Sequence, residues 1–162
     1  LYSLPDIFDE QFPNRANAFQ FDIDTRNIFI CADSKRLLSA FLELLSNAAE
    51  ADNSCGSIQI HSHVNACGHT VTVSVTGKGS LSEINPSEMQ TNPLIDADAP
   101  LTAQLSTPFF STKENHAGLG LSIVAQVCHT HHAGFELYSR NGFTTAGITF
   151  PILAMDDMRN TI

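Results

Sequence analysis

The sequence predicts an α+β fold, a two-layer sandwich in which helices pack on one face of a mixed, mainly antiparallel sheet. Pairs of short alternating segments, typical of strands, are interrupted by single segments with helical periodicity. This order favours a sandwich because each helix must bury its apolar stripe against a sheet. The chain has 162 residues, of which 43% are hydrophobic, which is enough for one domain with its own core.

The strand segments fall into three pairs. They are expected at 19–23 with 28–31, at 57–63 with 70–75, and at 135–139 with 144–150. In the first segment Phe19, Phe21 and Ile23 alternate with polar residues, which is the two-residue period of a strand. Asn65-Ala-Cys-Gly68 and Asn141-Gly142 predict the turns of the second and third pairs.

Two helices are predicted, at 34–52 and at 118–131. Asp33 stands at the N-cap position of the first helix, and Gly134 is a natural stop for the second. Between the second strand pair and the second helix, residues 77–117 show little periodicity and contain four prolines. A loop of this length inside a compact domain is usually functional, so we interpret it as a lid.

Charge and cysteine content limit the possible partners and location. Eight basic and seventeen acidic residues give a net charge of −9, which argues against nucleic-acid binding and direct membrane contact because both need clustered cations. The four cysteines form no C-x-x-C motif, which predicts reduced thiols in a cytoplasmic domain. The chain begins at Leu1 rather than Met, so we expect it to be a piece of a longer protein. This expectation is compatible with a full-length receptor that is anchored in a membrane.

The first chemical motif lies on the predicted 34–52 helix. Glu43 and Asn47 are four residues apart and therefore project from one helix face. A carboxylate beside an amide oxygen suits Mg²⁺, and the carboxylate is also a potential base. A solvated helix face is the alternative interpretation.

The second motif precedes and begins the 118–131 helix. Gly118 and Gly120 let a phosphate approach the backbone, where the helix N-terminus offers N–H groups and positive charge. Lys113, just upstream, adds a full charge. A flexible helix entry is the alternative interpretation.

These motifs together resemble a known family. E-L-L-S-N-A-A-E-A at 43–51 resembles the asparagine box of histidine kinase-like (Bergerat-fold) ATPases. P-F-F-S-T-K at 108–113 resembles their phenylalanine box, and G-L-G-L-S-I-V at 118–124 their second glycine box. The resemblance covers about residues 20–152 and is strongest to the nitrogen-regulation type of two-component sensor kinase.

The resemblance implies a role for each matching residue. Asn47 would hold Mg²⁺, and Glu43 would act as acid/base or position water. Phe109 and Phe110 would anchor the lid, and Lys113 would approach the phosphates of ATP. The remaining nucleotide-binding positions would be backbone positions of the two glycine boxes, namely Gly77, Gly79, Gly118, Leu119 and Gly120.

The resemblance also implies domain limits and partners. Residues 1–18 would lead in from a missing helical hairpin, 19–153 would form the ATP-binding domain, and 154–162 would be a tail. The domain would donate the γ-phosphate of ATP to a histidine on that hairpin. The same hairpin would form the dimer, and a cognate response regulator would be a further partner. The full-length protein is then expected to be a homodimer, and this fragment alone should not autophosphorylate.

The sequence departs from the family pattern at two positions. The first glycine box begins with an adenine-binding Asp in the family, whereas Val75 stands here, and His116 replaces a glycine of the second box. Valine accepts no hydrogen bond, and Thr76 is expected to point to the other side of its strand. A degenerate pseudokinase domain, which binds no nucleotide and acts as a protein-interaction module, therefore stays open as the alternative. A third interpretation of the sequence is an ATPase of the chaperone or mismatch-repair type.

The histidines give one further alternative. His61, His63, Cys67 and His69 cluster on the predicted 57–75 hairpin, where they are either a zinc site or plain surface residues. The spacing matches no common zinc module. His129, His131 and His132 are interpreted as structural residues at the end of the second helix.

Overall fold

The structure, a computed structural model, describes residues 10, 19–24, 26, 28–51, 57–81, 101–108 and 118–153. Five strands form one sheet in the order β1-β2-β3-β5-β4. Their bounds are Phe19–Asp22 (β1), Ile58–Val64 (β2), Thr70–Lys78 (β3), Gly134–Arg140 (β4) and Phe143–Pro151 (β5). The helices are Ser34–Ala51 (α2), Leu101–Leu105 (α4) and Gly120–Thr130 (α5).

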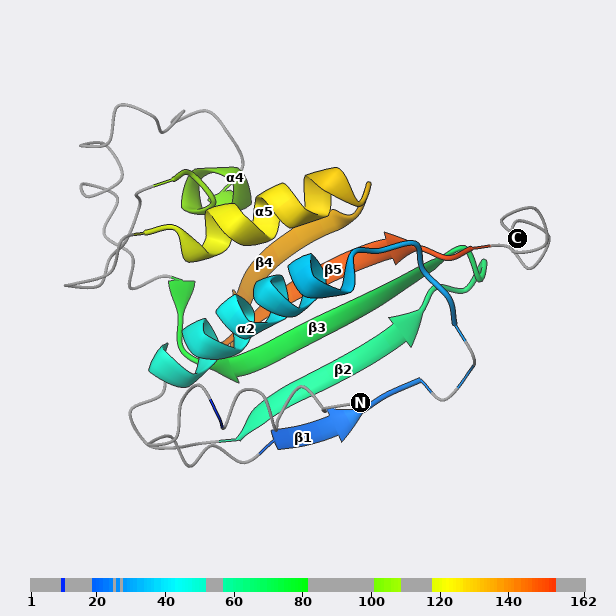
Figure 1. Ribbon diagram of the computed structural model, residues 1–162. Helices are drawn as coiled ribbons and strands as arrows, with labels where there is room; N and C mark the ends of the chain where they lie inside the picture. Colours follow the sequence, from blue (N-terminus) through cyan, green and yellow to red (C-terminus); the bar gives the residue numbers. More distant parts are fainter. Residues whose placement is uncertain are drawn as a thin grey trace.

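The sheet and the helices form two layers, as predicted. β1 pairs with β2 in parallel and the other neighbours are antiparallel, so the sheet is mixed and mainly antiparallel. Helices α2 and α5 lie side by side on one face of the sheet (Figure 1). Alternate strand residues point toward these helices and form the core with them. The most buried large members are Leu45, Ile58, Val75, Val124, Ile148 and Phe150.

Helix α2 begins where its cap residue predicts. The Asp33 Oδ1 accepts hydrogen bonds from the backbone N–H groups of Lys35 and Arg36, at 2.9 and 3.2 Å. The Arg36 bond holds the pKa of the Asp33 carboxyl below its usual value, because it favours the charged form. The predicted N-cap is therefore confirmed.

Helix α5 ends differently from the prediction. Gly134 is already the first residue of β4, and it is His132 that takes a positive φ of 51°. The Ala133 N–H then donates to the Cys128 carbonyl at 2.9 Å, which closes the helix. Before this turn, His131 accepts a bond from the Asp33 N–H through Nε2 at 2.9 Å, while its Nδ1 lies 2.7 Å from the Val127 carbonyl. Since a carbonyl only accepts, Nδ1 carries the proton, and the ring ties the end of α5 to the start of α2.

The structure differs from the prediction in two other details. Residues 28–31 form no strand, although Ile28 and Ile30 are packed against the core. Their alternation reflects this packing, while the Phe29 carbonyl accepts a single bond from the Leu153 N–H at 2.9 Å. Within the expected lid, β3 continues to Lys78 and α4 forms a short helix, with Leu105 buried.

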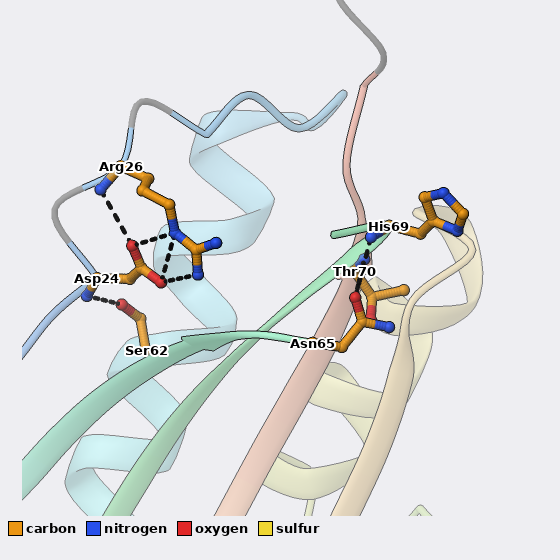
Figure 2. A network of polar contacts seen from close by, with 6 residues as sticks. All are labelled: Asp24, Arg26, Ser62, Asn65, His69 and Thr70. Atoms are coloured by element: carbon orange, nitrogen blue, oxygen red, sulfur yellow. Dashed lines mark hydrogen bonds and ion pairs between the residues drawn. The ribbon is translucent and has the colours of Figure 1, made fainter. Parts of the chain in front are cut away.

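Both hairpin turns are confirmed. The Asn65 Oδ1 accepts bonds from the N–H groups of His69 and Thr70, at 2.9 and 3.2 Å (Figure 2). Asn141 and Gly142 both have positive φ, 54° and 78°, which is the backbone of a type I′ turn.

The cysteines that the structure describes carry free thiols. Cys31 and Cys67 are exposed, and Cys128 is buried. Burial raises the pKa of the Cys128 thiol to about 11, so it stays protonated at neutral pH. Among the described helices, none is both long and apolar enough to cross a membrane.

An ion pair and several hydrogen bonds fix the chain that follows β1 (Figure 2). The Arg26 guanidinium forms an ion pair with Asp24, whose Oδ1 also accepts a bond from the Arg26 backbone N–H at 3.0 Å. The Asp24 N–H donates to the Ser62 Oγ on β2 at 2.7 Å. The bonds from Arg26, first those of its guanidinium and then that of its backbone N–H, hold the pKa of the Asp24 carboxyl far below its usual range.

Asp24→Asn is therefore expected to destabilise the domain more at neutral pH than in acid. The pKa of the Asp24 carboxyl is lower in the folded state than in the unfolded state. Its contribution to folding stability is therefore fully present above the unfolded-state pKa of about 3.9, and it is lost as the pH falls through the folded-state pKa. Urea unfolding at about pH 7 and about pH 2.5 measures this, and the difference between variant and parent should shrink in acid. Asp22→Asn, on a β1 side chain that is 88% exposed, is the control. An equal difference at both pH values would contradict the assignment.

Candidate functional site

The two predicted motifs meet between α2 and α5. A Cβ placed on Gly120, the first residue of α5, would lie 2.7 Å from the Glu43 Oε2 and 3.6 Å from the Asn47 Nδ2. Glycine thus leaves the space in which the carboxylate of Glu43 sits against the start of α5. Two segments far apart in the sequence therefore lie side by side, as the resemblance implied.

The burial of α2 explains why these two side chains face α5. Ala40, Leu44 and Leu45 of the same helix are buried on the sheet. Glu43 and Asn47 lie on a neighbouring flank and remain half-buried. The helix period therefore places a carboxylate and an amide next to the beginning of α5.

The first glycine box lies against the last turns of α2. A Cβ on Gly77 would meet the Ala48 Cβ at 2.8 Å and the Ala48 Cα at 3.1 Å. Gly79 has a φ of 145° and a Cβ there would lie 3.1 Å from the Ala51 Cβ. Close approach and backbone conformation both require glycine here. Ala48 follows Asn47, so the glycine box and the metal-binding candidate share one region.

The start of α5 has the features of an anion site. Gly118 has a φ of 65°, and Leu119 at the N-cap makes no side-chain capping bond. The first turn of α5 contains no acidic residue. The N–H groups of a first helical turn carry partial positive charge and attract phosphates.

The donor set fits a phosphate-bound magnesium ion. The Glu43 carboxylate and the Asn47 side-chain carbonyl offer hard oxygen ligands beside a helix N-terminus. Phe109, Phe110, Lys113 and His116, the other expected contributors, lie outside the described residues.

Val75, which stands where the resemblance implies an adenine-binding Asp, is a buried residue of the core. Its side chain is 2% exposed and belongs to the core, and in the sheet Val75 pairs with Ile60 and Ala146. The Thr76 hydroxyl points to the opposite face, as expected, where it lies 2.8 Å from the Thr145 hydroxyl. Neither residue offers a carboxylate for an adenine amino group.

The histidines of the β2–β3 hairpin form no metal cluster. His61, His63, Cys67 and His69 are all exposed. In the part of the chain that the structure describes, no group of three or more metal-ligating side chains lies together. The His61 Nε2 instead approaches the Asp22 carboxylate at 3.5 Å.

A separate cavity of about 450 Å³ lies at the opposite ends of the helices. It is lined by residues around the α2 cap, the end of α5 and the end of β5, including Asp33, His131 and Ile152. It is therefore not part of the site at Asn47 and Gly120.

Two further side chains near the glycine box were not indicated by any pattern in the sequence. The Thr144 Oγ1 donates to the Gly79 carbonyl at 3.0 Å, and the Ser139 Oγ lies 2.6 Å from the Thr144 Oγ1. They reach Gly79 through the strand register, which pairs Gly77 with Thr144 and Thr144 with Ser139. Only the three-dimensional pairing brings them together.

Comparison with known proteins gives consistent matches. A family model for histidine kinase-, DNA gyrase B-, and HSP90-like ATPases matches residues 32–154. The chain is 33% identical over 127 residues to the sensory histidine kinase/phosphatase NtrB of Rhizobium leguminosarum bv. phaseoli, covering 75% of this chain and 32% of that protein. It is 28% identical over 123 residues to the sensor histidine kinase ZraS of Escherichia coli (strain K12), covering 76% and 22%. The chain thus spans a third or less of these relatives.

Solved structures show the same fold. The catalytic domain of histidine kinase ThkA matches with a TM-score of 0.68 and 26% identity, covering 91% of this chain and 87% of that one. ThkA in complex with the response regulator protein TrrA matches with a TM-score of 0.66 and 24% identity, covering 93% and 38%.

Proposed function

This chain belongs to the histidine kinase-, DNA gyrase B-, and HSP90-like ATPase family, and from this premise we propose that it binds Mg-ATP as the catalytic domain of a two-component sensor kinase. It would donate the γ-phosphate to a histidine on a separate dimerisation domain. The observation that carries the proposal is the meeting of Glu43 and Asn47 with the Gly120 end of α5. A carboxylate, an amide and a helix N-terminus are what a metal-bound triphosphate requires.

The residues of the site have separate roles in this proposal. The Asn47 side-chain carbonyl holds Mg²⁺, which when bound neutralises charge on the phosphate oxygens. Glu43 orients the attacking group or takes its proton. The backbone at Gly118, Leu119 and Gly120 binds the phosphates, and catalysis is mostly positioning and charge neutralisation.

Other parts of the proposal concern segments outside the described residues. Phe109 and Phe110 would anchor a lid, and Lys113 would approach the phosphates. Residues 1–18 would connect to the helical hairpin that carries the phosphoacceptor histidine, 19–153 would be the catalytic domain, and 154–162 a tail. The complex of ThkA with the response regulator TrrA supports a cognate response regulator as partner of the full-length homodimer.

A second candidate function is favoured by the burial of Val75. Because valine has no carboxylate, the charge-assisted hydrogen bond from the adenine amino group, worth about 1.5–3 kcal/mol, is lost. The domain would then be a pseudokinase that binds no nucleotide and regulates a partner by docking.

Asn47→Ala is expected to weaken metal-dependent nucleotide binding. Removing the amide leaves the ion without this ligand, while the half-exposed position tolerates alanine. Calorimetry of the whole chain with Mg-ADP measures this: we expect binding in the parent and a loss of at least about tenfold in the variant.

Ser39→Ala is the matched control, on the same helix but on an exposed residue two turns before Asn47. It should bind as the parent does. No heat in the parent at millimolar Mg-ADP would contradict the kinase proposal and favour the docking module, and equal binding by Asn47→Ala would contradict the metal assignment.

A further inference from the structure

The second glycine of the first glycine box is fixed to the β4–β5 hairpin. The Gly79 N–H donates to the Gly142 carbonyl at 2.9 Å, and the Gly79 carbonyl accepts from the Thr144 Oγ1 at 3.0 Å. Both backbone polar groups of Gly79 are thus bound to one turn and one strand. This glycine is held in its positive-φ conformation rather than free to swing.

Ser139 extends the attachment to Leu81. The Leu81 N–H donates to the Ser139 Oγ at 2.9 Å, and the hydroxyl oxygens of Ser139 and Thr144 are 2.6 Å apart. A hydroxyl has one proton, and that of Thr144 goes to the Gly79 carbonyl, so Ser139 donates to Thr144. The direction of every bond is therefore set, from the Leu81 N–H through both hydroxyls to the Gly79 carbonyl.

The strand register places this hydroxyl pair on the side of the site. Ser139, Thr144 and Gly77 form one cross-strand row, and Gly77 packs on Ala48 of α2. The next cross-strand row on the same face of the sheet is apolar and also faces the helices; it consists of Leu137, Ala146 and Val75. The two hydroxyls are thus half-buried beside the glycine box, where an unmade hydrogen bond is costly.

We propose that Ser139 and Thr144 are positioning residues of the nucleotide site. Their hydroxyls hold the Gly77–Leu81 backbone against the β4–β5 hairpin, so that the glycine box is preset before the nucleotide arrives. The inference rests on the proposed function, because it assigns the held segment to the nucleotide site. A preset backbone lowers the ordering cost of binding.

Thr144→Val tests the proposal, since it keeps the shape and removes the donor. We expect Mg-ADP binding to weaken by roughly 3- to 10-fold, and amide hydrogen exchange at Gly79 and Leu81 to become faster by a similar factor. Thr144→Ser, which keeps the hydroxyl, should restore both. The matched control is Thr145→Val on the next residue of β5, which breaks the Thr76–Thr145 pair on the opposite face and should leave both readouts unchanged.

The outcomes separate this inference from the proposed function. If the parent binds Mg-ADP and Thr144→Val binds equally well, the positioning role is overturned and the function stands. A merely structural role would lower the melting temperature of Thr144→Val and Thr145→Val alike without changing affinity, which also overturns it. If the parent does not bind Mg-ADP, the proposed function fails and the positioning role with it, while the exchange rates show whether the hydroxyl pair still holds Gly79 and Leu81.

Discussion

Val75→Asp is expected to destabilise the nucleotide-free domain by about 3 kcal/mol. The side chain is 2% exposed and lies among the apolar residues of the core. A carboxylate there would be ionised without a partner or would take up a proton, and both cost stability. Because burial raises the pKa of such a group in the folded state, the cost should grow as the pH rises from 5 to about 8. Urea unfolding across this range measures the loss.

The same change is expected to strengthen nucleotide binding. In the family the aspartate of the first glycine box accepts a hydrogen bond from the adenine amino group. Restoring a charged acceptor is worth about 1.5–3 kcal/mol, which corresponds to roughly 10- to 100-fold in affinity for Mg-ADP. The increase in melting temperature on adding Mg-ADP should therefore be larger for Val75→Asp than for the parent.

Val71→Asp is the matched control for both effects. Val71 is buried on the same face of β3 as Val75. It lies four residues earlier in the strand and is therefore farther from the glycine box. It should lose similar stability and gain no affinity. If both variants respond to Mg-ADP in the same way, residue 75 does not face the purine and the alignment of the first glycine box is wrong.

Local signals made most of the fold predictable from the sequence. Asp33 predicts the start of α2 because a capping carboxylate acts within three residues. Asn65 and Asn141-Gly142 predict their turns for the same reason, since both depend on neighbouring backbone. The site at Asn47 and Gly120 was predicted by resemblance, and the packing of α2 on α5 brings the two motifs together.

Non-local contacts explain what the sequence did not predict. Residues 28–31 alternate like a strand, yet whether they pair depends on which strand edge is available to them. His131 joins α5 to the cap of α2 across 98 residues, and Ser139 reaches Leu81 across 58. No pattern along the chain encodes these partners, because they follow from sheet register and helix packing.

Gly77→Ala is expected to destabilise the domain by about 1–3 kcal/mol through overpacking. The new Cβ would lie 2.8 Å from the Ala48 Cβ and 3.1–3.2 Å from the Ala48 Cα and carbonyl oxygen. Two of these three atoms are backbone, so no side-chain rotation relieves the contact and α2 must move away from β3. Since Asn47 precedes Ala48, this shift also separates the amide from the start of α5, and Mg-ADP binding should weaken in the folded fraction.

Gly134→Ala separates overpacking from the general effect of losing a glycine. Gly134 also lies in a strand, but a Cβ there meets only the Thr149 Cβ, at an ordinary 3.8 Å. Its unfolding free energy should equal that of the parent or rise slightly, because alanine restricts the unfolded chain more than glycine does. Urea unfolding of both variants gives the comparison. Equal stability of Gly77→Ala and Gly134→Ala would mean that α2 does not approach β3 as closely as the structure places it, and the contact between the glycine box and the asparagine helix would have to be abandoned.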